Sequence, residues 1–437
     1  MRVICWDEMT DAQRAHLLGR GRDEFFAGPL KESIGRIIDD VRVNGDDAVC
    51  RALRDFDGVT LKPEQLRVTE SEFADAANLV GPELVSAITM MIANIRRFNE
   101  ALLERLADWQ FESMPGLMVG QKVTPIASAG LFCPSGKASY PSVLAQIATP
   151  AVVAGVSRKV VITPPIPGTN GAVDSATLVV AQQLGLTDIF RVNGPAGIAA
   201  VAFGTDHIPR VVKVVGPGSP PVVCAQIEVQ RYGCSTMMLL GPTESLIIAD
   251  ESADPIRLAA DLLNEAEHGT DSSVVFITAE ASIVEATQRE LARQIALLPD
   301  ARREAAAAAL GVNGGCILVD DLAQAAEVAN LYGPEHMQIA TQDPEAILAL
   351  IHNAGEVLLG QHTTLSAGNY VLGPPASLPT SGFSDQCGGI TVEAFLKRTA
   401  IAKADEAAMR MLAPYVITLA DHEGFPAHAN AQRIRMS

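Results

Sequence analysis

A carboxylate and an imidazole, two side chains that carry protons in many enzymes, lie next to each other at Glu335 and His336, directly after Gly333–Pro334. The histidine could take a proton from an alcohol or a water, and the glutamate could activate a water for attack. The same residues could instead begin a helix, because Gly-Pro breaks the preceding element and an acidic residue in the first turn interacts favourably with the helix dipole. The local pattern favours neither interpretation over the other.

Two more of the eight histidines, His268 and His428, also have acidic residues nearby. Glu265 and His268 are three positions apart, so on a helix they share one face and could bind a single metal ion. His428 and one further oxygen ligand would complete a set of four. The alternative is a helix end at which the histidine interacts with the dipole. For a spacing this common, the alternative is the more frequent case.

Signatures of nucleotide binding are weak. The chain has neither GxGxxG nor GxxxxGK[ST]. Gly216–Ser219 follows an expected strand and could approach a phosphate, and Pro134–Lys137 is similar, but each is equally an ordinary turn. No serine or cysteine lies in a nucleophile elbow, so acyl-enzyme chemistry is not expected.

Composition indicates a large α/β protein. The 437 residues are 48% hydrophobic but only 5% aromatic, which suits buried Val/Ile strands and more than one domain. A net charge of −18 argues against a nucleic-acid partner. The seven cysteines include no CxxC pair, which predicts reduced thiols and a cytoplasmic location. Residues 1–7 lack the apolar part of a signal peptide, and no run of 18 apolar residues predicts a membrane span.

The elements that must position these residues follow from periodicity. Most of residues 1–115 is expected to be helical, and so are Thr391–Lys397 and Lys403–Tyr415 in the tail. Between about 120 and 380, short Val/Ile strands alternate with helices in two blocks, which predicts parallel sheets with right-handed crossovers. The expected strands include Val160–Thr163, Ile189–Val192, Val211–Val215, Ser245–Ala249 and Ser273–Thr278, and the expected helices include Ser175–Leu184, Ile198–Phe203, Asp254–His268 and Ser282–Leu298.

Several short segments together resemble the histidinol dehydrogenase family across nearly the whole chain, in matching order and spacing. They are Phe132–Gly136, Thr149–Ala151, Gly241–Glu244, Glu265–Ser272, Gly333–His336, Leu378–Thr380 and Glu423–His428. The resemblance implies two NAD-dependent oxidations that take the amino alcohol histidinol through a bound aldehyde to histidine, with a zinc ion holding the substrate. It also implies an intertwined homodimer in which the tail of one subunit completes the site of its partner.

The resemblance further implies a fold of two Rossmann-like parallel-sheet α/β domains with small N- and C-terminal helical segments. The expected boundaries are an N-terminal arm at 1–20, a first domain of 21–129 with 244–384, a second domain of 130–243, and a helical tail at 385–437 that contributes to the partner's site.

By the same resemblance, His336 is the general base and Glu335 activates the water of the second step. His268 and His428 match zinc ligands, but the family's zinc-binding glutamine is Glu265 here and its aspartate is Asn369. The two changes run in opposite directions, so the ligand set keeps one negative charge and zinc binding is still expected. An amide oxygen is a weaker ligand than a carboxylate, which can change affinity or exchange.

Thr243 and Glu423 match positions that contact the substrate, whereas the family's substrate-binding histidine is replaced by Ala376. At the cofactor, the family's tyrosine, glutamine and asparagine are replaced by Phe132, Ala196 and Ser219. Each lost hydrogen bond between neutral groups is worth about 0.5–1.5 kcal/mol, so these changes together could alter the preferred substrate or cofactor.

The sequence thus predicts a zinc-dependent, NAD-linked dehydrogenase that acts on a small alcohol, with L-histidinol as the expected substrate. Three alternatives remain at this point. The chain could be a paralogue that oxidises another small polar alcohol, a zinc hydrolase that uses Glu335 and a water without NAD, or a paralogue that binds a metabolite without catalysis.

Overall fold

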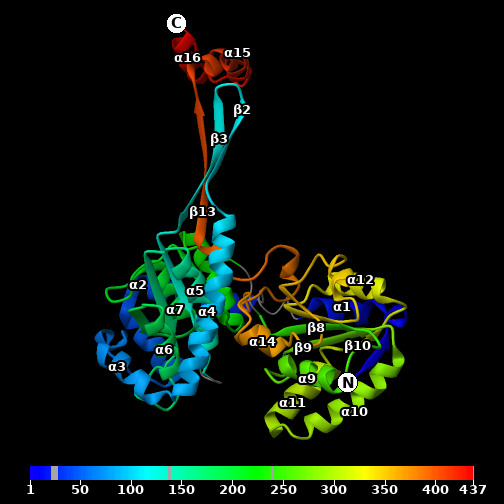
Figure 1. Ribbon diagram of the computed structural model, residues 1–437. Helices are drawn as coiled ribbons and strands as arrows, with labels where there is room; N and C mark the ends of the chain where they lie inside the picture. The colour runs from blue at the N-terminus through cyan, green and yellow to red at the C-terminus, as the bar shows by residue number, and fades with distance from the viewer. Residues whose placement is uncertain (21–27, 136–138, 238–240, 437) are drawn as a thin grey trace.

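Two separate parallel sheets form the body of the protein (Figure 1). The computed structural model describes residues 1–20, 28–135, 139–237 and 241–436. The larger sheet has six strands in the order β1-β10-β9-β8-β11-β12, all paired in parallel. Its strands are β1 (Val3–Cys5), β8 (Glu244–Ala249), β9 (Ser273–Thr278), β10 (Gly315–Leu318), β11 (His336–Ala340) and β12 (Glu356–Leu359).

Helices connect these strands and cover both faces of the larger sheet, as parallel pairing requires. Asp254 caps α9 (Pro255–Ala266) with its side chain, and Pro255 occupies the first turn of that helix. The helices are α1 (Asp11–Gly19), α9 (Pro255–Ala266), α10 (Ala281–Ile295), α11 (Asp300–Gly311), α12 (Leu322–Tyr332), α13 (Pro344–Leu348) and α14 (Leu365–Tyr370).

The smaller sheet has four parallel strands in the order β6-β5-β4-β7. Its strands are β4 (Ser128–Phe132), β5 (Arg158–Thr163), β6 (Asp188–Arg191) and β7 (Lys213–Val215), and its connecting helices are α5 (Pro141–Val153), α6 (Ser175–Gln183), α7 (Gly194–Phe203) and α8 (Pro220–Val229). The two parallel sheets confirm the predicted α/β fold, and the strands expected between 160 and 278 are present.

The grouping of segments around the two sheets differs from the predicted boundaries. Residues 28–105 form α2 (Gly28–Asp57), α3 (Glu70–Leu79) and α4 (Pro82–Arg105). Ile34 and Ile38 of α2 pack with the core of the smaller sheet, as do Ile88 and Ile95 of α4. These helices therefore belong with 128–229 and not with 244–384. Helical periodicity shows that a face is apolar, but it does not show which sheet that face covers.

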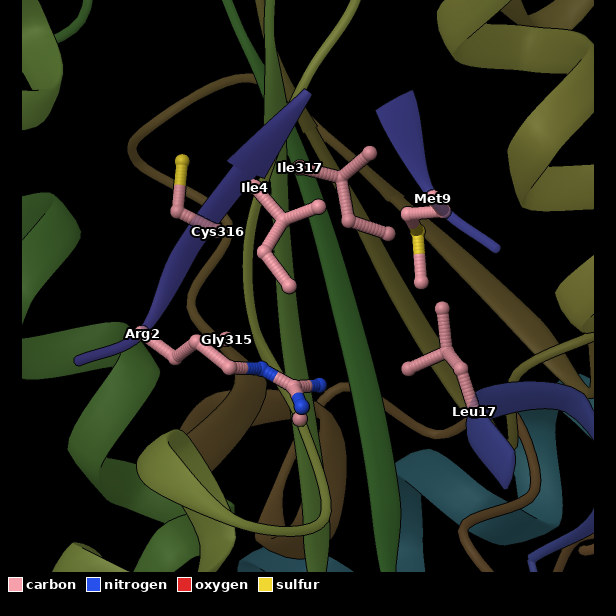
Figure 2. A pocket seen from close by; sticks show the side chains of 8 residues that line it. Arg2, Ile4, Met9, Leu17, Gly315, Cys316 and Ile317 are labelled. Carbon is pink, nitrogen blue, oxygen red and sulfur yellow. The ribbon is translucent and has the colours of Figure 1, made fainter. Parts of the chain in front are cut away.

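The predicted N-terminal arm at 1–20 is also part of a domain. β1 pairs in parallel with β10, with Val3 opposite Cys316. Figure 2 shows the packing beneath this edge, where Ile4, Met9, Leu17 and Ile317 surround a void of about 10 Å³. That volume is about the least that can hold one water molecule, so this edge of the sheet is a packed core.

A long antiparallel arm rises from the body and carries the C-terminal helices (Figure 1). It consists of β2 (Trp109–Met114), β3 (Leu117–Pro125) and β13 (Leu396–Ala404), and it leads to α15 (Glu406–His422) and α16 (Pro426–Met436). Of the helix predicted at 391–397, Val392–Phe395 forms a 3-10 helix, but the strand β13 begins at Leu396. The helical assignment at 109–114 was wrong, because β2 lies there. β13 is a strand because it pairs along its full length with β3, a contact between distant parts of the chain that local periodicity does not show.

Within the described parts of the chain, no single helix is long and apolar enough to cross a membrane. The pair α3 and α4 passes that test together on length and composition, with a bend of 109° between the two helices.

Candidate active site

A cavity of about 500 Å³ is lined by segments of both sheets. It contains most of the side chains that the sequence singled out. Those that line it are Phe132, Ser219, Thr243, Glu265, His268, Glu335, His336, Asn369 and Ala376. Residues spread over nearly 250 positions are therefore brought to one place, as a site built at the ends of parallel strands requires.

Three predicted site residues do not line this cavity. Ala196 is buried in α7 within the core of the smaller sheet. Glu423 and His428 lie at the end of the arm, where His428 contacts the ring of Phe425 with a centroid separation of 5.2 Å. Figure 1 shows α15 and α16 far from both sheets, so within one chain neither of these residues reaches Glu265 or His336.

His336 is the first residue of the strand β11. The alternative from the sequence, a helix that begins at this point, is therefore wrong. The side chain is buried, and its Nδ1 lies 2.6 Å from Oε1 of Glu356. The two residues are directly paired across β11 and β12. Because Nδ1 is engaged, Nε2 is the ring nitrogen left to act on a ligand. Glu356 was not predicted from the sequence; the signal there is a carboxylate at the start of the otherwise apolar strand β12.

Glu335 is also buried, and its Oε2 accepts a hydrogen bond of 3.0 Å from the backbone N–H of Glu244. Its Oε1 lies 3.8 Å from Nε2 of His336. Burial raises the pKa of Glu335 to about 8, more than the nearby histidine lowers it. Burial alone would lower the pKa of His336, but Glu335 and Glu356 outweigh it and raise that pKa to about 10. Two buried, strongly perturbed proton carriers in one cavity are typical of a catalytic site.

Arg20 stabilises the surroundings of Glu335 and His336 through Glu244 and Tyr332. Its guanidinium forms a buried ion pair of 2.5 Å with Glu244 and donates to the carbonyl of Tyr332 at 2.6 Å. The guanidinium also lies 4.1 Å from the centre of the Tyr332 ring. Glu244 in turn accepts from the N–H of Ser381 and holds Glu335 through its own N–H. This network holds two loops against the start of β8. One is the loop between α12 and β11, and the other is the loop at 378–381.

Glu265 lies at the end of α9 and is fully buried. Its Oε1 accepts hydrogen bonds from Nδ2 of Asn369 at 2.6 Å and from Nδ2 of Asn264 at 2.8 Å. Nε2 of His268 lies 3.3 Å from the other oxygen, Oε2. That contact lacks hydrogen-bond geometry, so Oε2 has no hydrogen-bond partner among the residues described. A buried carboxylate oxygen without a partner is costly, which suits a position that a cation would occupy.

No group of three or more His, Cys, Asp or Glu side chains is arranged to hold a metal ion within the described ranges. The cluster here contains Glu265 and His268, and its third member is the amide of Asn369. The fourth predicted ligand, His428, lies on the arm.

The wall formed by the smaller sheet is suited to a nucleotide. The cavity is lined by Tyr140, Asn193 and Ser219, which are the N-cap residues of α5, α7 and α8. Helix N-termini bind phosphate groups through free N–H groups and the helix dipole. At Gly216, φ is +136° and a Cβ would overlap the carbonyl of Phe132, so the backbone comes this close only with glycine. The other predicted glycine turn, at 136–137, lies outside the described residues.

Comparison with known proteins identifies the family of this chain. Residues 22–436 match the family described as "Histidinol dehydrogenase". A "Histidinol dehydrogenase homolog" of Colwellia psychrerythraea is 39% identical, over 97% of this chain and 94% of its own length. A "Histidinol dehydrogenase" of Synechocystis is 38% identical, over 91% of both chains. The crystal structure of histidinol dehydrogenase from Elizabethkingia anophelis is 30% identical, with a TM-score of 0.93 over 100% of this chain and 98% of that one. The chain therefore belongs to the histidinol dehydrogenase family.

Proposed function

We propose that this protein is a zinc-dependent, NAD-linked dehydrogenase that oxidises L-histidinol through the aldehyde to L-histidine. The observation that carries the proposal is the buried imidazole of His336, which is held through Nδ1 by Glu356 and adjoins the carboxyl of Glu335 in a cavity between the two sheets. Family membership makes the protein a dehydrogenase by class. The substrate, the metal and the cofactor are the proposed parts.

In the first step, Nε2 of His336 removes the hydroxyl proton of the alcohol. The ring does this in its neutral form, whose share grows as the pH approaches the raised pKa of about 10. NAD, bound at the wall formed by the smaller sheet, would accept the hydride from the same carbon, which gives the aldehyde. Glu356 keeps the ring oriented and stabilises the imidazolium that forms. In the second step, Glu335 accepts a proton from the water that adds to the aldehyde. A second molecule of NAD would accept the hydride from the resulting hydrate, which gives the acid.

A zinc ion would be held by Glu265, His268 and Asn369, and when bound it polarises the oxygen of the substrate. Oε2 of Glu265, which has no hydrogen-bond partner in the described residues, is the ligand oxygen that the geometry offers. Nδ2 of Asn369 donates to Glu265, so Oδ1 is the amide atom left for the metal. The resemblance implies a glutamine and an aspartate at these two positions in the family. That pair would carry the same charge and would also offer one amide donor to one carboxylate.

The position of the tail supports an intertwined homodimer. His428 and Glu423 lie beyond the end of the arm, away from their own chain's cavity (Figure 1). In the proposed dimer, the partner subunit's His428 would complete the metal ligands and the partner subunit's Glu423 would contact the substrate. All seven cysteines are free thiols, which supports the proposed cytoplasmic location.

A second candidate is a paralogue that oxidises a different small polar alcohol. Ala376 lines the cavity where a histidine would contact the imidazole of histidinol, and a methyl group supplies no hydrogen bond there. A paralogue that binds a metabolite without catalysis is the outcome expected if the altered cofactor positions Phe132, Ala196 and Ser219 abolish NAD binding.

The test is histidinol-dependent reduction of NAD by the purified protein, with zinc added and after chelation, together with zinc content by atomic absorption. Zinc-dependent reduction in wild type and none in His336→Asn would support the proposal. Bound zinc without histidinol activity would point to another alcohol. Absence of both zinc and NAD binding would favour the non-catalytic paralogue, and near-normal turnover by His336→Asn would remove the assigned base.

A further inference from the structure

Gln146 is a buried polar side chain in the wall of the same cavity. It lies on α5, one turn after Ser142 and Val143, which also line the cavity. Only 2% of the residue is exposed. Neither the proposed chemistry nor the predicted site assigns it a role.

The orientation of the Gln146 amide is fixed by one hydrogen bond. Its Oε1 accepts from the backbone N–H of Ala376 at 3.3 Å. Only the oxygen of an amide can accept such a bond, so the NH2 group is at the other position. That Nε2 has no hydrogen-bond partner among the residues described. The cavity wall therefore contains a buried donor with nothing to donate to, which is unfavourable until a ligand or water supplies an acceptor.

Ala376 places this donor beside an otherwise apolar part of the wall. Both residues line the cavity, and the backbone of Ala376 holds the amide of Gln146. The methyl side chain of Ala376 carries no polar group that could meet a substrate. Gln146 is thus the polar side chain available at this position of the wall.

We propose that Gln146 determines substrate specificity by donating from Nε2 to the end of the substrate remote from the oxidised carbon. The substrate class is a small amino alcohol or diol whose remote end carries a hydrogen-bond acceptor, either an oxygen or a ring nitrogen. A substrate with an apolar end would leave the donor unpaired and be rejected. This inference rests on the proposed function, because it assumes that a small alcohol occupies the cavity.

The experiment measures binding separately from turnover. Two matched pairs of compounds are titrated calorimetrically into the zinc-loaded full-length protein: L-histidinol against L-leucinol, and glycerol against propane-1,2-diol. Within each pair the reacting end is the same, and only the first compound has an acceptor at the remote end. Wild type is expected to prefer the first compound by about 3- to 10-fold, the value of one hydrogen bond between neutral groups.

Two variants and one control locate the effect. Gln146→Met keeps the length of the side chain but removes both polar atoms. Gln146→Glu keeps an oxygen for the N–H of Ala376 and replaces the donor by a second oxygen. Both should reduce the preference to less than about 2-fold. Thr149→Val is the control, because Thr149 is a fully buried polar residue one turn further along α5 that does not line the cavity, and it should keep the wild-type preference.

The outcomes separate this inference from the proposed function. A wild-type preference that both variants lose and Thr149→Val keeps would support recognition by Gln146, whether or not NAD is reduced. The same preference without NAD reduction would contradict the dehydrogenase function alone. Equal binding within each pair by wild type, or an unchanged preference in Gln146→Glu, would overturn the role of Gln146. If Gln146→Met does not fold by circular dichroism, Gln146→Glu decides.

Discussion

His336 and Glu356 lie directly opposite each other on β11 and β12, with Nδ1 of the ring 2.6 Å from Oε1 of the carboxylate. The parallel register therefore sets the orientation of the proposed base. A shift of one residue in either strand would turn the carboxylate to the other face of the sheet. The proton-transfer geometry is thus a property of the strand pairing and does not depend on a loop.

The first prediction concerns this pair. In Glu356→Gln, the new amide can donate to Nδ1, which forces the ring proton onto Nε2 and blocks its role as a base. We expect kcat to fall by at least about 100-fold with a small change in KM. Steady-state kinetics of NAD reduction measures this, with Tm as the control for folding. A kcat close to wild type would show that Glu356 does not position the base.

The second prediction separates the two oxidations. Glu335→Gln keeps an oxygen for the N–H of Glu244 but cannot accept a proton from water. We expect the alcohol to be oxidised once, so that about one NADH forms per alcohol and the aldehyde accumulates. Trapping the aldehyde with semicarbazide and counting NADH measures this. Formation of about two NADH per alcohol would assign the second step to another group.

The third prediction tests the pair Glu265 and Asn369 at the proposed metal site. Asn369→Asp places two carboxylates where an amide now donates at 2.6 Å. We expect the metal-free protein to lose about 1–3 kcal/mol of stability, and the double variant Glu265→Gln with Asn369→Asp to recover most of it. Chemical denaturation of the metal-free proteins measures this coupling. Additive effects of the two changes would mean that the side chains do not act as a pair.

Zinc content provides the matching measurement on the same variants. Glu265→Gln alone leaves a neutral ligand set and should bind zinc more weakly than wild type, whereas the double variant restores one negative charge and should bind about one zinc per site. Equal zinc retention by all variants after chelation would place the metal elsewhere.

The fourth prediction tests whether two subunits share each site. His336→Asn and His428→Ala should each be inactive as homodimers. In a mixed dimer, one of the two sites has an intact body and an intact partner tail. Random pairing makes about half of the dimers mixed, so about one quarter of wild-type activity should return on co-expression. No recovered activity in purified mixed dimers would place both residues in a site formed by one chain.

The fifth prediction concerns pH and a site far from the cavity. Nδ1 of His207 lies 2.7 Å from Oδ2 of Asp46, and this hydrogen bond raises the pKa of His207. A raised folded pKa stabilises the protein below the unfolded value of about 6.5. That stabilisation is lost as the pH rises through the folded pKa. The Tm difference between wild type and His207→Asn should therefore shrink from about pH 6 to pH 9. The effect is small because the side chain is more than one-third exposed. A difference that grows with pH would contradict the assignment.

Local patterns in the sequence predicted the five strands from β5 to β9, because a buried parallel strand needs only a short Val/Ile run. They named no strand at β1, β4, β10, β11 or β12. They did not predict where α2 and α4 pack, since an amphipathic helix fits either sheet. β13 was missed for a related reason: its pairing partner β3 is more than 270 residues earlier in the chain, and its own sequence, LKRTAIAKA, alternates only weakly.

The candidate site was predicted largely through short motifs, which located Glu335, His336, Glu265 and His268. The supporting residues were not found in this way. Arg20 and Glu356 act through contacts with residues far away in the sequence. No motif surrounds either residue, and the local signal at Glu356 is a single carboxylate in an otherwise apolar strand. Gln146 was missed because a lone glutamine in an apolar helix carries no motif, and only its unpaired Nε2 distinguishes it.

The exposed apolar residues of the arm affect the folding and assembly of newly synthesised chains. Trp109 and Phe111 on β2, and Tyr415 and Leu419 on α15, are each more than half exposed in a single chain. Apolar surface of this extent favours association with whatever is nearby. If the protein forms the proposed dimer, a newly synthesised chain is prone to non-specific association until it dimerises. The yield of protein in a cell would then depend on whether chaperones shield the arm for long enough.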